Sequence, residues 1–212
     1  AWDADNVSHG DDAREYVVIH NAVANRLETT INKRLEMDAS KIKNLKVTGV
    51  LGSEDYYFMR TKMTSLQRVN LKEVESLING VYKIPSSAFS GKTTLIKCFL
   101  PDKLERIESD AFSGTALTGT ILLPEGLKYV AGFSNTKITN IHFPTTLEEI
   151  GDGAFSNCRS LMTSISFPES LKKIGDSAFS SSAISGNLVF PENLEYIGNG
   201  AFSNCVNLTG SL

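Results

Sequence analysis

Three cysteines are the residues of this chain best suited to chemistry, because a thiol can form a disulfide, bind zinc or act as a nucleophile. Cys158 and Cys205 occupy equivalent positions of a repeated motif, two repeats apart. Adjacent strands lie about 4.8 Å apart, so two steps separate them by roughly 10 Å, beyond the disulfide reach of about 7 Å. Cys98 takes an inward strand position. We therefore expect three reduced, structural cysteines and no zinc site, since zinc usually takes paired ligands at short spacing.

The other reactive side chains form no recognisable catalytic motif. None of the histidines lies in a His-Glu-x-x-His arrangement or near a recognisable nucleophile: His9, His20 and His142. The same serine follows a repeated Ala-Phe pair five times, as a scaffold turn would: Ser90, Ser113, Ser156, Ser180 and Ser203. Glu148, Glu149 and Asp152 suggest a carboxylate site, but lysines fill such positions in other repeats, which indicates a solvated face. We therefore expect no enzyme activity, no metal and no cofactor.

Composition disfavours two classes of partner. Of the 212 residues, 41% are apolar and 21% are charged, with a formal net charge of -3, as in ordinary soluble globular proteins. This slightly acidic balance argues against nucleic acid, whose binding proteins usually carry a basic stripe. No apolar run approaches the roughly 20 residues that span a bilayer, and residues 1–5 contain no signal-peptide core. Membrane attachment is expected only through an anchor outside this sequence.

An internal repeat of about 23 residues is the main evidence for the fold. The pair Ala-Phe recurs at Ala88-Phe89, Ala111-Phe112, Ala154-Phe155, Ala178-Phe179 and Ala201-Phe202, with a degenerate copy at Ala131-Gly132-Phe133. Upstream of it, an apolar pair three residues apart, Leu-x-x-Ile or Leu-x-x-Val, recurs in register. A proline stands three residues before each of these pairs: Pro101, Pro124, Pro144, Pro168 and Pro191. Three independent features in register are too many for chance.

Each repeat unit predicts a strand followed by a return segment. The residues before the proline alternate inward and outward, as in Ile141-His142-Phe143. Proline then ends the strand, because it cannot donate to the ladder. The Leu-x-x-Ile and Ala-Phe pairs return the chain along the other side, with Gly151, Gly175 and Gly198 expected to supply permissive turn geometry. One unit cannot cover its own apolar face, so we expect stacked units in a parallel-stranded solenoid.

The repeats are similar to a known family. Residues 143–158, FPTTLEEIGDGAFSNC, closely resemble the BspA-like class of leucine-rich repeats, and the match is specific over about residues 85–212. Residues 42–47 and 66–71 fit only the strand half of the unit, and the interval from Leu71 to Leu100 is too long for one repeat. The resemblance implies a surface or secreted protein of a host-associated bacterium or a protist parasite, linked to adhesion and protein binding.

An amphipathic helix is expected near the N-terminus. From about Asp12 to Leu35, apolar residues follow three-to-four spacing: Tyr16, Ile19, Val23, Leu27, Ile31 and Leu35. Asp11 or Asp12 would cap its start. Such a helix would cover the open edge of the first repeat. The alternative is a membrane-surface helix, which the mixed charges of the outer face disfavour.

The expected fold is an α/β repeat, a right-handed leucine-rich-repeat solenoid with parallel strands on one face and an N-terminal helical cap. The cap is assigned to residues 1–38 and the solenoid to 39–212. Within the solenoid, 39–84 would form atypical first repeats and 85–212 BspA-like repeats, cut short at the C-terminal end.

A recognition surface is expected on the strand face, which we predict to be concave and continuous. Outward positions two residues before each proline form one column: Asn70, Phe99, Leu122, His142, Ser166 and Val189. Positions four residues before it form a second: Arg68, Lys97, Thr120, Asn140, Ser164 and Asn187. Phe99, Leu122 and His142 suggest an interaction patch. In the alternative, the irregular segment 74–83 covers Phe99 and Leu122.

The function expected from this resemblance is a non-catalytic protein-binding or adhesion module at the cell surface or outside the cell. Its partner would be a protein, such as a host extracellular-matrix or surface protein. A carbohydrate-binding region or a structural spacer of a larger surface protein is the alternative. Sugar binding would need exposed aromatic rings, and the two columns contain only Phe99. A hydrolase is disfavoured, because no acid/base pair or nucleophile stands out from the repeat background.

Overall fold

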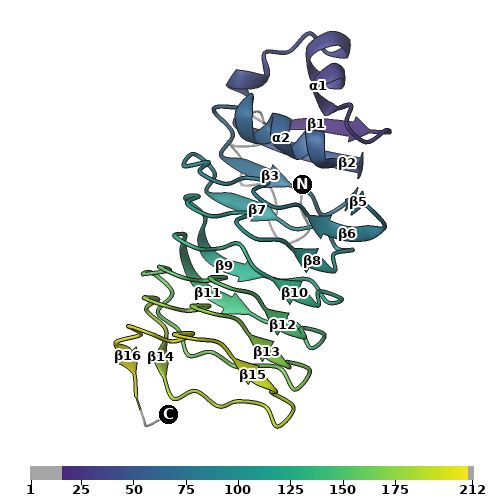
Figure 1. Cartoon of the computed structure of the whole chain (residues 1–212). Helices are drawn as coiled ribbons and strands as arrows, with labels where there is room; N and C mark the ends of the chain where they lie inside the picture. Colours follow the sequence, from purple (N-terminus) through teal and green to yellow (C-terminus); the bar gives the residue numbers. More distant parts are fainter. Residues whose placement is uncertain (1–15, 210–212) are drawn as a thin grey trace.

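Residues 16–209 are described by the computed structural model, in which successive coils stack along one axis (Figure 1). His9 and the expected helix cap at Asp11 or Asp12 lie outside these residues. One side of the stack, called the first face, carries mainly parallel strands in three separate groups. These are β1 (Tyr16–Asn21), β2 (Asn44–Val50), β3 (Arg68–Asn70) and β7 (Lys97–Phe99), with β4 (Val74–Glu75) beside β2; β9 (Thr118–Leu122) with β11 (Lys137–His142); and β14 (Ser185–Gly186) with β16 (Asn207–Leu208).

A second strand ladder, called the second face, runs unbroken along another side of the stack. Its strands are β5 (Leu77–Ile78), β6 (Val81–Ile84), β8 (Arg106–Ile107), β10 (Tyr129–Val130), β12 (Glu149–Ile150), β13 (Lys173–Ile174) and β15 (Tyr196–Ile197). The Leu-x-x-Ile segments therefore form a parallel ladder of their own from β6 to β15. The expectation of strands on one face alone is corrected by this second ladder, whose two-residue strands are too short to show alternation in the sequence.

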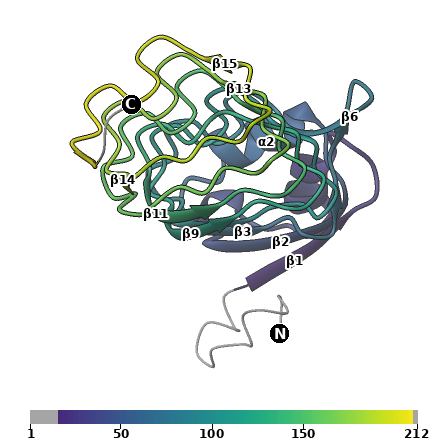
Figure 2. The ribbon, with the colours of Figure 1, turned by 90° about the horizontal axis from the view of Figure 1, so that it is seen from below.

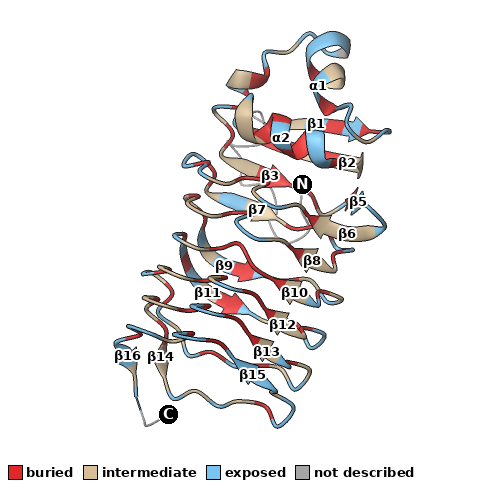
Figure 3. Cartoon of the chain, viewed as in Figure 1, coloured by how far each residue is buried: buried red, intermediate tan, exposed pale blue. Residues whose placement is uncertain are grey.

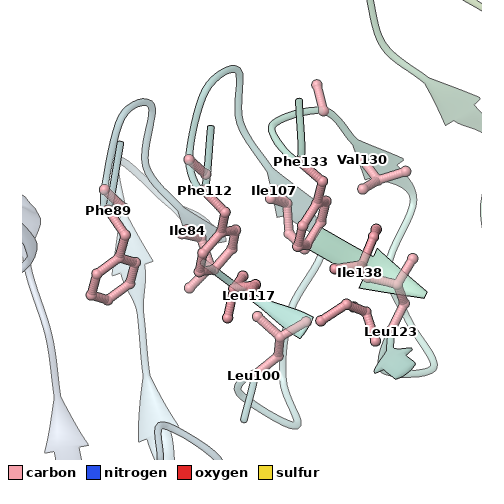
Figure 4. Close-up of a cluster of buried hydrophobic side chains, with 14 of the residues drawn as sticks. Ile84, Phe89, Leu100, Ile107, Phe112, Leu117, Leu123, Val130, Phe133 and Ile138 are labelled. Atoms are coloured by element: carbon pink, nitrogen blue, oxygen red, sulfur yellow. The ribbon is translucent and has the colours of Figure 1, made fainter. Parts of the chain in front are cut away.

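The Ala-Phe pairs form a third line of contacts through the core. Their rings stack with centroids 5.0 to 5.7 Å apart in the order Phe89, Phe112, Phe133, Phe155, Phe179 and Phe202. Figure 4 shows the first three of them. From Phe89 to Phe179, each phenylalanine N–H also donates to a carbonyl of the following repeat, at 2.7 to 2.8 Å. Seen along the axis, the coils enclose this core between their sides (Figure 2). The predicted parallel-stranded solenoid is confirmed.

The turn geometry around Ala-Phe comes from residues other than those expected. Left-handed backbone precedes the alanine at Ser87, Asp110, Gly153, Ser177 and Gly200, with φ between 55° and 63°. Gly151, Gly175 and Gly198 do not have positive φ; instead, a Cβ on each would collide with the neighbouring repeat. These three glycines therefore permit close stacking of the coils, and their predicted role in the turn is wrong.

The N-terminal helix is much shorter than its apolar spacing predicts. Tyr16–Asn21 forms strand β1, which pairs in parallel with β2, so the helical prediction is wrong for these residues. Between β1 and β2, helical structure is confined to α1 (Leu27–Thr29), the π-helical turn Thr30–Arg34 and a 3-10 turn at Ala39–Lys41. Leu27 and Ile31 are fully buried in the core at the N-terminal end of the stack. Ile19 and Val23 fit helical spacing, but pairing with β2 gives Ile19 a strand environment.

A hairpin explains the irregular segment before Pro101. It is formed by β5 and β6 and turns at Asn79 and Gly80, both with positive φ. Helix α2 (Ser53–Thr61) lies one coil earlier, after β2, and buries Tyr56, Phe58 and Met59 in the core. Strands β2, β3 and β7 remain in register through Asn44, Arg68 and Lys97.

Candidate functional site

The ladder of the first face breaks between β7 and β9. Strand β7 ends one sheet and β9 ends the next, so both are edge strands. A backbone hydrogen bond from Thr118 N–H to the Ile96 carbonyl, at 3.3 Å, joins the flank of β7 to the start of β9. The second face stays paired at the same level, where Ile84 opposes Ile107, and Phe89 stacks on Phe112 at 5.4 Å. The two coils therefore separate on the first face alone (Figure 1).

A cleft of about 300 Å³ lies at this break. Its walls include Lys97, Cys98 and Phe99 from β7 and Thr120, Leu122 and Leu123 from β9 and its end. Leu122 is 66% exposed, and Phe99 is half-buried beneath the Lys97 ammonium, which lies 4.9 Å from the ring centroid. Four of the predicted site residues therefore meet around one hollow, whose lining also includes Lys72 and Asp102.

The cleft reaches the core at Cys98. Its register partner in β3, Val69, is fully buried, whereas Cys98 is only half-buried because β7 has no strand on its other side. Desolvation raises the pKa of the Cys98 thiol above its ordinary value, so the thiol is neutral at physiological pH. Cys98, Cys158 and Cys205 are all free, as expected, although the expectation of a fully buried Cys98 is wrong. The alternation of strand residues gave no signal that this position would open.

The alternative that segment 74–83 covers the patch is wrong for Leu122. That segment forms β4, β5 and β6, of which β5 and β6 belong to the second face. Figure 3 shows exposed residues on β7, β9 and β11 along the first face.

Asn70 does not belong to the accessible surface. It is 1% exposed, and its Oδ1 accepts from the Lys72 backbone N–H at 3.0 Å. The chain turns immediately after β3, and the amide satisfies that turn, so its expected outward position is corrected. Arg68, two residues before Asn70 in β3, is half-buried, and its Nη1 donates to Asn44 Oδ1 at 3.5 Å.

The remaining predicted residues lie away from the cleft, in the next two strand groups. On β11, His142 is exposed and its Nε2 lies 3.5 Å from Asn140 Nδ2. Beyond a second interruption of the ladder, Ser166 bridges to Val189, which is 76% exposed. The same group contains the exposed Ser164 and Asn187, and Asn187 Oδ1 accepts from the Thr209 hydroxyl at 3.1 Å. The first face is thus discontinuous, and the expected continuous sheet is wrong.

On the second face, outward basic side chains contact acidic or aromatic side chains of neighbouring strands. The Arg106 guanidinium lies 3.9 Å from the Tyr129 ring centroid, and Lys173 Nζ lies 2.8 Å from Glu149 Oε1. Lys173 also lies 5.9 Å from the Tyr196 ring. These side chains already have partners within the chain, whereas Leu122 on the first face exposes apolar surface to solvent.

The described residues bring no group of three or more histidine, cysteine or acidic side chains together in a way that could hold a metal ion. Nor does this part of the chain contain a helix long and apolar enough to cross a membrane.

Comparison with known proteins gives a family match. A family model described as BspA type Leucine rich repeat region matches in six copies over residues 54–132 and 129–210. No curated protein matches the chain.

Three solved structures are similar to it. A leucine-rich repeat protein from Bacteroides ovatus is 22% identical, with a TM-score of 0.51 over 81% of this chain and 55% of that chain. A leucine-rich repeat protein from T. pallidum is 25% identical, with a TM-score of 0.45 over 92% and 73%. A leucine rich cell surface protein from Faecalibacterium prausnitzii is 17% identical, with a TM-score of 0.36 over 91% and 81%.

At this identity, the Bacteroides ovatus structure supports the leucine-rich-repeat fold alone. The chain spans 55% of the length of that protein. The handedness of the solenoid stays a prediction.

Proposed function

The chain belongs to the BspA type leucine-rich-repeat family, and from that membership we propose that it is a non-catalytic protein-binding module that serves adhesion at a bacterial cell surface. The family resemblance supports the surface location. The cleft between β7 and β9 is the observation that carries the proposal, because it combines exposed apolar side chains with a rigid support.

Apolar surface beside a hollow is the feature that protein interfaces use. Binding energy concentrates in a few side chains that become desolvated in the complex, surrounded by contacts that exclude water. Leu122 and Phe99 are suited to this role, because burial of Leu122 would remove a side chain that is now 66% exposed from water. The polar residues Lys97 and Thr120 would then form the rim.

The supporting scaffold limits the cost of ordering the site on binding. Behind the cleft, Phe89 and Phe112 are fully buried and stacked, and β6 pairs with β8. A site held by such contacts loses little conformational freedom when a partner binds, so more of the interaction energy contributes to affinity.

The test is capture of host extracellular-matrix and surface proteins by the immobilised full chain. We expect a triple variant, Phe99→Ser, Leu122→Ser and His142→Ser, to bind the captured partner at least about tenfold more weakly, because it removes the two apolar side chains of the cleft and the exposed imidazole on β11. Met162→Ser is the matched control, since Met162 is 72% exposed and lies outside the cleft. It should bind like the parent chain.

Circular dichroism and thermal unfolding must show that all three proteins are equally folded. Equal binding by the triple variant would contradict a site on the first face. Binding by none of the proteins would favour the structural spacer.

A second cavity favours the carbohydrate-binding alternative. It measures about 520 Å³ and lies between α2 and the β5–β6 hairpin, with Glu54, Tyr57, Arg60 and Asn79 in its walls. Tyr57 is 53% exposed, and the Arg60 guanidinium lies 5.5 Å from its ring centroid. An aromatic ring among polar groups is the arrangement that stacks on a sugar. Glycan binding that survives the triple substitution and is lost in Tyr57→Ala would support this alternative.

A further inference from the structure

The backbone at the cleft has a free strand edge on each side. In a parallel strand, alternate residues direct their N–H and C=O groups to opposite neighbours. Lys97 N–H donates to the Gln67 carbonyl and the Phe99 carbonyl accepts from Leu71 N–H, so both residues bond toward β3. By alternation, the residue between them points its N–H and C=O toward β9. The Ile96 carbonyl, which accepts from Thr118 N–H, also points that way, although the Ile96 N–H donates to the Gln67 carbonyl.

Cys98 belongs to the set that points toward β9. Among the described residues, no strand pairing joins β7, which contains Cys98, to β9. Strand β9 pairs with β11 along one edge and has no partner strand along the other. The walls of the cleft therefore offer backbone donors and acceptors in addition to apolar side chains.

Such an edge is a template for an added strand. Extended peptides bind to exposed sheet edges through main-chain hydrogen bonds, and pockets for alternate side chains supply the specificity. Here Phe99 and Leu122 flank the opening from the two sides. The charged residues of the lining are Lys72, Lys97 and Asp102, so positive charge is in excess. An apolar side chain followed closely by a carboxylate would complement these groups.

We propose that the β7–β9 cleft binds an extended peptide segment of the partner protein by strand addition. This inference rests on the proposed protein-binding function and deepens it by specifying the partner's form. An apolar side chain of the segment lies between Phe99 and Leu122, an acidic residue lies near Lys97, and its backbone bonds to the free edge at Cys98.

The test begins with a displayed library of short random peptides selected on the full chain. The tightest-binding peptide is then synthesised with a single N-methyl group at each backbone nitrogen in turn. We expect a loss of affinity of about tenfold at every second position, because alternate N–H groups face the same strand edge and N-methylation removes the donor. Replacing the peptide's acidic residue with its amide should also weaken binding.

Hydrogen exchange at the strand edge provides a second, local readout. The bound peptide should slow exchange of the Cys98 backbone N–H, because that residue lies on the edge strand β7. Leu122→Ser should weaken peptide binding, and Met162→Ser should leave it unchanged.

Three outcomes would overturn the proposal: no selected peptide depends on Leu122, N-methylation is tolerated at every position, or the bound peptide leaves hydrogen exchange at Cys98 unchanged. Each is distinguishable from failure of the proposed function. If the captured host protein still loses affinity for the triple variant, the protein-binding module stands and strand addition fails. If host capture also fails, the proposed function fails with it.

Discussion

Replacing Phe155 with alanine is expected to lower the free energy of unfolding by about 4 kcal/mol, because it leaves a cavity in the middle of the aromatic stack. Phe155 is fully buried and stacks on Phe133 at 5.7 Å and on Phe179 at 5.3 Å. A third ring, Phe143, meets it edge-on at 5.9 Å. The loss therefore affects contacts between three consecutive coils. Urea unfolding followed by circular dichroism measures it.

Two matched variants separate the causes of that loss. Phe155→Leu keeps most of the buried volume and removes the stacking, so we expect a cost of about 1 kcal/mol. Phe202→Ala removes a ring that is only half-buried, so it should cost less than Phe155→Ala. A cost below about 1 kcal/mol for Phe155→Ala would show that the stack does not hold the coils together.

Asp55→Ala is expected to destabilise the chain by about 3 kcal/mol, because it removes a buried carboxylate on which several donors depend. Asp55 is 1% exposed. Its Oδ2 accepts from the backbone N–H groups of Gly52 at 2.9 Å and Asn25 at 2.7 Å, and its Oδ1 accepts from Leu27 N–H at 2.9 Å. Asn21 Nδ2 lies 3.3 Å from Oδ2. The carboxylate thereby ties β1 and the start of α1 to helix α2.

Glu54→Ala is the control for this second prediction. Glu54 is the neighbouring acidic residue in the first turn of α2, but it is exposed. Its removal should change the free energy of unfolding by about 0.5 kcal/mol or less. Urea unfolding gives both values, and hydrogen exchange should show faster exchange in residues 16–43 of Asp55→Ala. Equal effects from the two substitutions would contradict the structural role of Asp55.

The repeat units could be predicted from sequence because three residue patterns each correspond to one physical requirement. Proline ends a strand, Leu-x-x-Ile supplies inward anchors, and Ala-Phe supplies a ring that stacks on its equivalent in the next coil. The aliphatic anchors and rings are buried together as expected, as with Ile107 and Phe112, except in the last repeat, where Ile197 is 43% exposed. The ladder made by two-residue strands such as Tyr129–Val130 could not be recognised by alternation.

The N-terminal error shows the limit of apolar periodicity. Ile19 and Val23 fit a helix, yet Val23 is 61% exposed and Ile19 lies in a strand. The edge of β2 offers β1 a ladder of parallel pairs, which outweighs a weak helical preference.

Strand alternation predicted which side chains of the site point outward, but it did not predict the cleft. Alternation correctly placed Leu122 and Lys97 on the outside, since it depends only on local strand geometry. It could not predict the break between β7 and β9, because the spacing of two coils depends on contacts along the whole turn of the solenoid. Cys98 was therefore expected in the core and instead lines the cleft.

Hydrogen–deuterium exchange of the full chain, with and without the captured host protein, tests the protein-binding site most directly. We expect slower exchange on binding in residues 97–100 and 118–123, with no change in β10, β12 and β13 on the second face. Slower exchange confined to the second face, or no change anywhere on the first face, would contradict a binding site at the β7–β9 cleft.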